Sequence, residues 1–466
     1  MSDWKLKLYH KLPASLRSLA AGMRGRELKA WRFGAETDQL VADALARESW
    51  TADKWKTWQQ ERLAFVLHRA ATRVPYYRSY WEQRRQGGDR ASYEQIENWP
   101  VLTKDELRKN TAAFVADDCE RKTMFRESTS GTSGKPLELW WTRATVRAWS
   151  ALVEARVRQW HGVNRHEPWS ILGGQAVVAG CATKPPYWVH NRPMKQLYLS
   201  ANHVSARNAP DYAAALEKHG ATYLWGYSSS LAYLGEQIAK GGKTPPTLKA
   251  VFTNAEPLYP WQREAIQRGF GCAARETYGM AEIAMAGSEC PHGSLHAWPE
   301  VGFTEVWDDE VDRPAEPGRS GRLICTTLLN ADMPLVRYAL GDRGRMQLPE
   351  WRCACGRLLP GIAEIEGRTN DMLITASGRR VFWLNPVLYG LPLLEAQIVQ
   401  QEIGEVMVRY VPATNFGPTT MQTISERLNS RMGKVNVRFE VVERIPREAN
   451  GKFRAVKCLI APAKLP

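Results

Sequence analysis

The sequence lacks the features of membrane-embedded, secreted and repetitive proteins. No segment approaches about 18 uninterrupted apolar residues, the length that favours a membrane-spanning helix. Residues 1–26 are studded with Lys and Arg and contain no apolar stretch of the kind found in secretory signal peptides. No internal repeat or low-complexity tract is present. We therefore expect a cytoplasmic protein without a transmembrane segment.

Cysteine is scarce, and positive charge is abundant but dispersed. Eight cysteines in 466 residues, without a secretory signal, favour thiols or metal ligands in a reducing compartment over a disulfide framework. The net charge of +14 indicates anionic partners. Because no dense basic tract is present, we expect pockets for phosphorylated ligands and no nucleic-acid partner. The 44% hydrophobic content predicts a globular chain of two or three domains.

Hydrophobic periodicity predicts an α/β protein in three parts. Residues 1–120 read as the helical beginning of a large domain. Residues 121–369 alternate strand-like and helical runs, which predicts an α/β core with partly parallel sheets. Residues 370–466 read as a small, mobile α+β domain. The first thirty residues have the pattern of a basic amphipathic helix, for which packing on the main domain is favoured over a membrane surface.

A loop rich in hydroxyl groups, glycine and lysine is the most informative stretch. Glycines let backbone N–H groups approach an anion, and a lysine supplies a charge suited to phosphate. Flexible surface turns have a similar composition, so the loop alone leaves both interpretations open. Its residues are Ser128, Thr129, Ser130, Gly131, Thr132, Ser133, Gly134 and Lys135.

Further short motifs follow this loop along the chain. Tyr278–Glu282 combines an aromatic ring that can stack on a purine with a carboxylate that can hold Mg²⁺. Asn254–Glu256 follows a predicted strand, where α/β proteins usually place ligand groups. The stretches Val336–Asp342, Glu366–Asp371 and Asn450–Arg454 complete the set. Each one alone is weak, since Asn-Gly-Lys, for example, is usually a hairpin tip.

In this order, over residues 100–457, the motifs resemble those of the adenylate-forming superfamily. Within it the chain looks most like the phenylacetate–CoA ligase family, and especially its CapK-like branch. Segments that support the assignment are Pro100–Lys104, Gly226–Ser229, Ala255–Leu258 and Ile445–Arg447. The resemblance implies an adenylate-forming fold with a large N-terminal domain and a small C-terminal one.

The resemblance also implies how ATP is held. The 128–135 loop would bind the β- and γ-phosphates, Tyr278 would stack on adenine, and Gly279 would lie in the same nucleotide site. Asp342 would accept the ribose hydroxyls, helped by Arg368. Glu256 would belong to the same nucleotide site.

The catalytic groups implied by the resemblance are Lys135, Glu282 and Lys452. Glu282 would bind Mg²⁺, and Lys452 would reach the α-phosphate from the small domain while a carboxylate attacks the phosphorus. An anion can attack a phosphoryl group only when cations and N–H donors neutralise its charge. The product would be an acyl-adenylate.

The acyl pocket implied by the resemblance contains Tyr227, Asn254, Met280 and Ala281. Trp and Tyr in this region are equally consistent with ordinary core. The superfamily usually has Thr or Ser in place of Ala281, so one hydroxyl contact is missing here, which leaves room for slow or altered adenylation. The hinge usually carries Asp where Asn370 stands.

Three of the cysteines and one histidine predict a metal site. Cys353 and Cys355 are soft ligands one residue apart, and Cys290 with His296 could complete a tetrahedral zinc site. His292 is the reserve ligand. Some members of the family look similar here. Four protein ligands leave no open position, so we predict a structural Zn²⁺.

The leading functional hypothesis is an ATP- and Mg²⁺-dependent, AMP-forming ligase that joins a small carboxylic acid to coenzyme A. One alternative is an amide-forming ligase that acylates an amine or amino sugar in polysaccharide or natural-product biosynthesis. Another is a catalytically weak binding or scaffold protein, which the Ala281 departure favours. A homodimer is left open.

Overall fold

The computed structural model describes residues 3–128, 137–175, 177–242, 248–368, 373–378, 380–381, 384–388, 390–448 and 453–460. Its large part contains one sheet of 13 described strands, in the order β12-β11-β13-β14-β15-β10-β9-β8-β7-β6-β3-β5-β4. Neighbouring pairs from β3 to β8 run parallel, whereas β8 and the strands that follow it pair antiparallel. The strand pairing therefore changes from parallel to antiparallel at β8, the strand that carries the Tyr-Gly motif.

The N-terminal segment is helical, as its periodicity predicts. Its helices are α1 (Asp3–Lys11), α2 (Ala14–Arg32), α3 (Thr37–Ala46), α4 (Ala52–Arg73), α5 (Pro75–Gln86) and α6 (Lys104–Lys109). α4 and α5 pack with the antiparallel strands around a core that includes Leu67, Tyr77, Trp99, Leu323 and Tyr338. Pro75 opens α5, and the hydroxyl of Thr103 accepts the N–H of Glu106 (3.2 Å), which caps α6.

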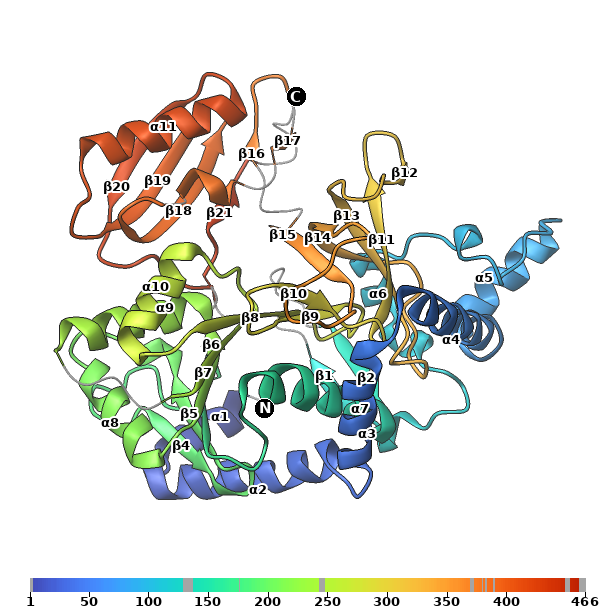
Figure 1. Cartoon of the computed structure of the whole chain (residues 1–466), viewed down its shortest axis with the longest axis horizontal. Coiled ribbons are helices and arrows are strands. Elements are labelled where there is room, and N and C mark those ends of the chain that lie inside the picture. Colours follow the sequence, from blue (N-terminus) through green and yellow to red (C-terminus); the bar gives the residue numbers. More distant parts are fainter. Residues whose placement is uncertain are drawn as a thin grey trace.

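The parallel half of the sheet is covered by helices on both faces (Figure 1). α8, α9 and α10 pack on one face, whereas α3 and α7 pack on the other. β7 reads Ala-Val-Phe-Thr-Asn with its first four residues buried, the pattern of a central parallel strand. The helices are α7 (Arg143–Val153), α8 (Ala209–His219), α9 (Ser228–Lys240) and α10 (Pro260–Phe270). The strands are β3 (Trp169–Gly173), β4 (Trp188–Asn191), β5 (Gln196–Ser200), β6 (Tyr223–Tyr227), β7 (Ala250–Asn254) and β8 (Ala274–Gly279).

The antiparallel half continues the sheet away from β8. Its strands are β9 (Ala286–Glu289), β10 (Leu295–Ala297), β11 (Gly302–Asp308), β12 (Arg313–Pro314), β13 (Gly321–Thr327), β14 (Tyr338–Met346) and β15 (Gly361–Arg368). A separate two-stranded sheet pairs β1 (Phe125–Ser128) with β2 (Glu138–Trp141). The candidate phosphate loop connects these two strands.

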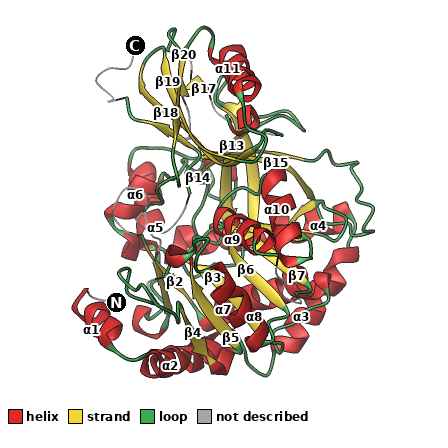
Figure 2. Cartoon of the chain, turned by 90° about the vertical axis from the view of Figure 1, so that its left-hand side faces the viewer, coloured by secondary structure: helices red, strands yellow, loops and turns green. Residues whose placement is uncertain are grey.

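Residues after 372 form a smaller α/β unit with a core of its own, seen at the top of Figures 1 and 2. A four-stranded sheet in the order β20-β19-β18-β21 carries α11. The elements are β16 (Leu373–Ile374), β17 (Arg380–Val381), β18 (Leu393–Glu402), β19 (Glu405–Pro412), α11 (Pro418–Met432), β20 (Asn436–Val441) and β21 (Val456–Cys458). Among the described helices, none is long and apolar enough to cross a membrane.

Candidate active site

The carboxyl ends of the parallel strands bring several predicted residues to one edge of the sheet. Tyr227 ends β6 directly opposite Asn254, which ends β7. Tyr278 and Gly279 end β8, which lies parallel to β7. This edge is where parallel α/β sheets usually bind their ligands. The buried amide oxygen of Asn254 has no hydrogen-bond partner among the described residues, so it is available to a ligand.

Glu256 lies just beyond β7 and links three parts of the chain. Its Oε2 accepts the N–H of Ser229 at the start of α9 (3.0 Å), and its Oε1 accepts the N–H of Phe453 (2.5 Å). Burial raises the pKa of Glu256, and the two N–H donors offset part of that rise. Phe453 directly follows Lys452, so this contact holds the chain beside the predicted catalytic lysine against the large part of the molecule.

Tyr278 and Asp342 are 64 residues apart in the sequence and meet in the structure. The hydroxyl of Tyr278 donates to Oδ2 of Asp342 at 2.8 Å. Asp342 lies on β14, opposite Arg368 of β15 in the register of the two strands. The two residues predicted to hold adenine and ribose thus belong to one site, at the point where the parallel half of the sheet meets the antiparallel half.

Glu282 is a buried carboxylate, 5% exposed, with two partners that converge on one oxygen. Lys104 Nζ lies 2.9 Å from its Oε1, and the hydroxyl of Tyr338 donates to the same atom at 3.1 Å. Burial alone would raise the pKa of Glu282, but the Lys104 ammonium outweighs it and holds this pKa below its usual value. The carboxylate is therefore ionised at neutral pH.

Lys104, the ion-pair partner of Glu282, is positioned by a short parallel bridge between Leu102 and Tyr338. The N–H of Leu102 donates to the carbonyl of Arg337 (3.0 Å), and the N–H of Ala339 donates to the carbonyl of Leu102 (2.9 Å). Lys104 follows this bridge and the Thr103 cap. The motif Pro100–Lys104 thus contributes Lys104, the ion-pair partner of Glu282, for which the sequence predicted no role.

Glu282 fits Mg²⁺ only as a single protein ligand. The one cluster of three or more potential ligand residues found among the described residues is the Cys/His group discussed below. Mg²⁺ commonly uses one or two carboxylates, with the remaining positions taken by water and substrate phosphates. One ionised carboxylate satisfies that requirement.

Met280 and Ala281 lie between Tyr278 and Glu282 and are partly buried against the core shared with α4 and α5. Ser128 ends β1. The predicted residues Thr129–Lys135 and Lys452, and the side chain of Arg368, lie outside the part of the chain that the structure describes.

Cys290, His296, Cys353 and Cys355 are brought together by the β9–β10 hairpin and the loop after β14. Their candidate ligand atoms all lie within 4.8 Å of one another. The Sγ atoms of Cys290 and Cys353 are 3.7 Å apart, and Sγ of Cys355 lies 3.4 Å from Nε2 of His296. His292, the reserve ligand, is exposed and outside this group.

The spacing of the cluster fits a tetrahedral ion. Two thiolates about 2.3 Å from one Zn²⁺ lie about 3.8 Å apart at the tetrahedral angle, close to the observed sulfur–sulfur distance. A disulfide would need a distance of about 2.05 Å. The other ring nitrogen of His296 lies 3.3 Å from the carbonyl of Leu359, a partner of the kind that orients ligating histidines.

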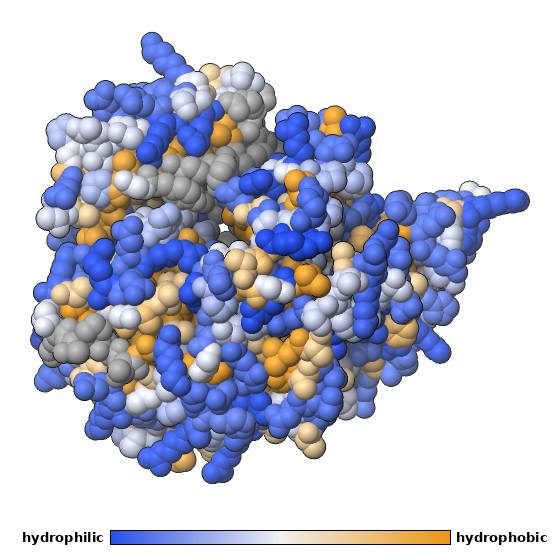
Figure 3. Space-filling view, in the orientation of Figure 1, coloured by the Kyte–Doolittle hydropathy of each residue, from blue (hydrophilic) through white to orange (hydrophobic). Residues whose placement is uncertain are grey.

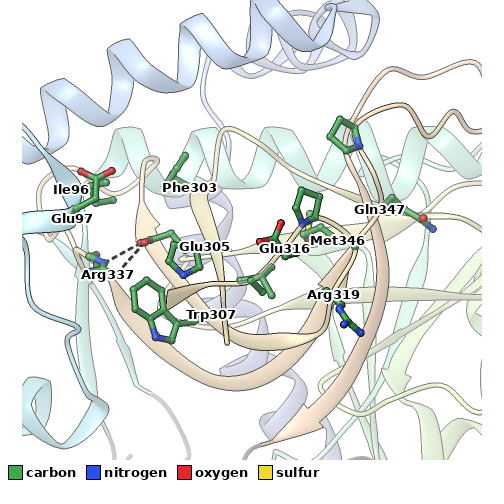
Figure 4. Close-up of a pocket in the computed structure, with 16 residues that line it drawn as sticks. Ile96, Glu97, Phe303, Glu305, Trp307, Glu316, Arg319, Arg337, Met346 and Gln347 are labelled. Atoms are coloured by element: carbon green, nitrogen blue, oxygen red, sulfur yellow. Dashed lines mark hydrogen bonds and ion pairs between the residues drawn. The ribbon is translucent and has the colours of Figure 1, made fainter. Parts of the chain in front are cut away.

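A separate cavity of about 640 Å³ lies between β11, β12 and residues 96–97 (Figure 4). Phe303, Trp307 and Met346 line it, and an ion pair between Arg337 and Glu305 lies at one side (3.1 Å). None of the predicted site residues lines this cavity.

The whole chain has the fold of adenylate-forming ligases. 2-Hydroxyisobutyryl-CoA ligase, in its postadenylation state with 2-HIB-AMP, matches with a TM-score of 0.68 at 20% identity. The match covers 90% of this chain and 92% of the ligase. The same ligase in its thioesterification state, with 2-HIB-AMP and CoA, gives a TM-score of 0.54. At this level of identity the likeness establishes the fold, and it confirms the predicted fold class.

The sequence relatives include CapK and several phenylacetate–CoA ligases. Protein CapK of Staphylococcus aureus is 25% identical over 386 residues, which cover 81% of this chain and 84% of CapK. The phenylacetate–CoA ligase of Thermus thermophilus is 26% identical over 347 residues, covering 70% and 73%. The family model for the CapK C-terminal domain matches residues 380–458. The chain is thus a homologue of CapK and of the phenylacetate–CoA ligases, an AMP-forming ligase, and the predicted family resemblance is confirmed.

Proposed function

We propose that this protein activates a small carboxylic acid with ATP and transfers the resulting acyl group to coenzyme A. The observation that carries the proposal is the meeting of Tyr278 with Asp342 beside an ionised, buried Glu282 at the ligand-binding edge of the sheet. Several of its sequence relatives are phenylacetate–CoA ligases. The structural neighbour 2-hydroxyisobutyryl-CoA ligase has been observed with an acyl-adenylate and CoA.

In the proposed reaction, Tyr278 and Asp342 orient the nucleoside while the 128–135 loop and Lys135 hold the phosphates that leave as pyrophosphate. A carboxylate oxygen of the acid attacks the α-phosphorus, and the bond to the bridging oxygen of pyrophosphate breaks. Lys452 neutralises charge on the oxygens around the reacting phosphorus. Mg²⁺ held by Glu282 would supply further charge stabilisation at the phosphates.

The proposed acyl pocket is bordered by Tyr227, Asn254, Met280 and Ala281. The unpartnered amide oxygen of Asn254 favours an acid that carries a hydrogen-bond donor over a purely apolar one. Because this amide oxygen is buried, a ligand without a hydrogen-bond donor would leave the oxygen without a hydrogen bond.

A second candidate is transfer of the acyl group to an amine. CapK aligns with a larger share of this chain than the phenylacetate–CoA ligases do, and the CapK C-terminal model covers the small domain. In a two-step ligase the acceptor must reach the adenylate after the first step. The CapK-like small domain therefore keeps an amine or amino sugar as the alternative acceptor. The scaffold alternative is favoured by Ala281 alone.

The decisive experiment is mass spectrometry of the products formed from ATP, a panel of carboxylic acids, and either coenzyme A or candidate amines. We expect AMP and pyrophosphate to be released only with the matching acid, together with an acyl-CoA. An amide product would show that the acceptor is an amine and not the thiol of coenzyme A. No turnover across a broad panel would contradict the proposal and favour the scaffold alternative.

A further inference from the structure

The outer face of α1 and α2 carries an unusual concentration of exposed apolar side chains. Of the eleven large apolar residues recorded as exposed in the described part of the chain, five lie in these two helices. We call them the N-terminal stripe: Trp4, Leu8, Leu16, Leu19 and Met23. Trp4 is 63% exposed, and Leu19 and Met23 are each 61% exposed. A surface helix normally buries its apolar residues, and a contiguous exposed apolar face is typical of an interaction surface.

The inner face of α2 is already fixed to the body of the protein. Arg17 is buried and donates from Nη1 to the carbonyl of Val177 (3.1 Å). Gly25 is packed so tightly that an added Cβ would lie 1.8 Å from Oδ1 of Asn191. The expected packing on the main domain is therefore present, yet it uses only one side of the helix.

The three stripe residues of α2 lie on the opposite side of this helix. At about 100° per residue, Leu16, Leu19 and Met23 fall within about 60° of one another, facing away from Arg17 and Gly25. α2 therefore has two faces, one buried and one exposed. Rotating the helix to hide the stripe would break the Gly25 contact.

Positive charge surrounds the stripe. Residues 3–32 contain eight Lys or Arg and only two Asp or Glu. Exposed members are Lys7, Lys11, Arg24, Arg26 and Lys29, of which Arg24 forms an ion pair with the exposed Glu27 (2.6 Å). Cations beside apolar residues complement the anionic headgroups and acyl boundary of a membrane, where tryptophan is also favoured. A second copy of the chain would instead bring these like charges together.

We propose that α1 and α2 form a docking surface for anionic membranes, with the stripe inserted at the headgroup level. Both views of the molecule place α2 at the end opposite the small C-terminal unit (Figures 1 and 2). In the space-filling view this lower edge is mostly hydrophilic, with isolated apolar residues (Figure 3). Docking there leaves the carboxyl edge of the sheet and the small unit accessible. The inference does not depend on the proposed reaction.

The test is flotation of the full chain with vesicles of phosphatidylcholine, with or without about 30 mol% phosphatidylglycerol. We expect at least about tenfold stronger partitioning onto the anionic vesicles, and its loss in about 0.5 M salt. A double variant, Leu19→Asp with Met23→Asp, removes the apolar contact. A second variant, Lys7→Glu with Lys11→Glu and Arg26→Glu, reverses the charge. Each is expected to weaken binding at least about tenfold.

The matched control is Val311→Asp with Val441→Asp, two exposed apolar residues elsewhere, which should bind within about twofold of the wild type. Circular dichroism melting checks that every variant is folded. Absence of wild-type binding to anionic vesicles, or equal binding by the stripe variant, would overturn the proposal. So would sedimentation velocity that shows a dimer dissociated by the stripe variant, without vesicle binding, because the partner would then be a second copy.

Discussion

The buried carboxylate of Glu282 depends on a lysine that is 178 residues away in sequence. A carboxylate removed from water is costly unless a counter-charge and hydrogen-bond donors replace its hydration. Lys104 supplies the charge and Tyr338 supplies a hydroxyl donor. The pair keeps the proposed metal-binding carboxylate ionised when no substrate is bound.

Replacing Lys104 by Met should destabilise the protein because it leaves the Glu282 charge buried and unpaired. We expect the free energy of unfolding at pH 7 to fall by about 2–3 kcal/mol, less than for a fully buried pair because Lys104 is partly exposed. Urea unfolding followed by tryptophan fluorescence measures this. The matched control is Lys109→Met, which alters an exposed lysine on the same helix and should change little.

The same pair sets a direction for the pH dependence. Since the folded-state pKa of Glu282 is lowered, its contribution to stability is fully present above the unfolded value of about 4.3 and is lost as the pH falls through the folded-state pKa. The gap between wild type and Lys104→Met should therefore narrow near about pH 4. A gap that stays constant from pH 7 downwards would show that the loss comes from packing.

At the scale of elements, the cysteine cluster joins the β9–β10 hairpin to the loop between β14 and β15. Replacing Cys353 by Ser should remove the proposed zinc, because an alcohol is a poor ligand for it. By elemental analysis we expect about one zinc per wild-type chain and little in the variant, with a lower melting temperature. Cys181→Ser, an exposed cysteine outside the cluster, should keep both. Zinc-free wild-type protein would contradict the assignment.

Local sequence predicted the elements better than the contacts between them. Thr103 caps α6, a role typical of Thr before a helix. The sequence grouped the Cys-x-Cys pair with Cys290 and His296, and these four residues lie together in the structure. The Lys104–Glu282 pair could not be predicted from the sequence, because it depends on the bridge between Leu102 and Tyr338. The hydrophobic periodicity around Leu102 or around Tyr338 does not encode which residues of the two segments pair.

At the scale of the whole molecule, the order of the motifs predicted the class of enzyme, but not how the small unit lies on the large one. That arrangement depends on single long-range contacts such as Phe453 with Glu256, where a backbone N–H meets a buried carboxylate. The likeness to 2-hydroxyisobutyryl-CoA ligase is higher for its postadenylation state than for its thioesterification state.

We propose that Lys452 serves the adenylation half of the reaction. It directly precedes Phe453, whose N–H donates to Glu256. Lys452→Ala should slow pyrophosphate release roughly 100- to 1,000-fold, because charge at the α-phosphorus loses its cation, while ATP affinity changes little. Acyl transfer from a supplied acyl-adenylate needs no such neutralisation and should persist. Lys434→Ala, an exposed lysine on the same small unit, is the control. Equal loss of both half-reactions would mean that Lys452 supports folding or closure, and an unchanged first half-reaction would remove it from the chemistry.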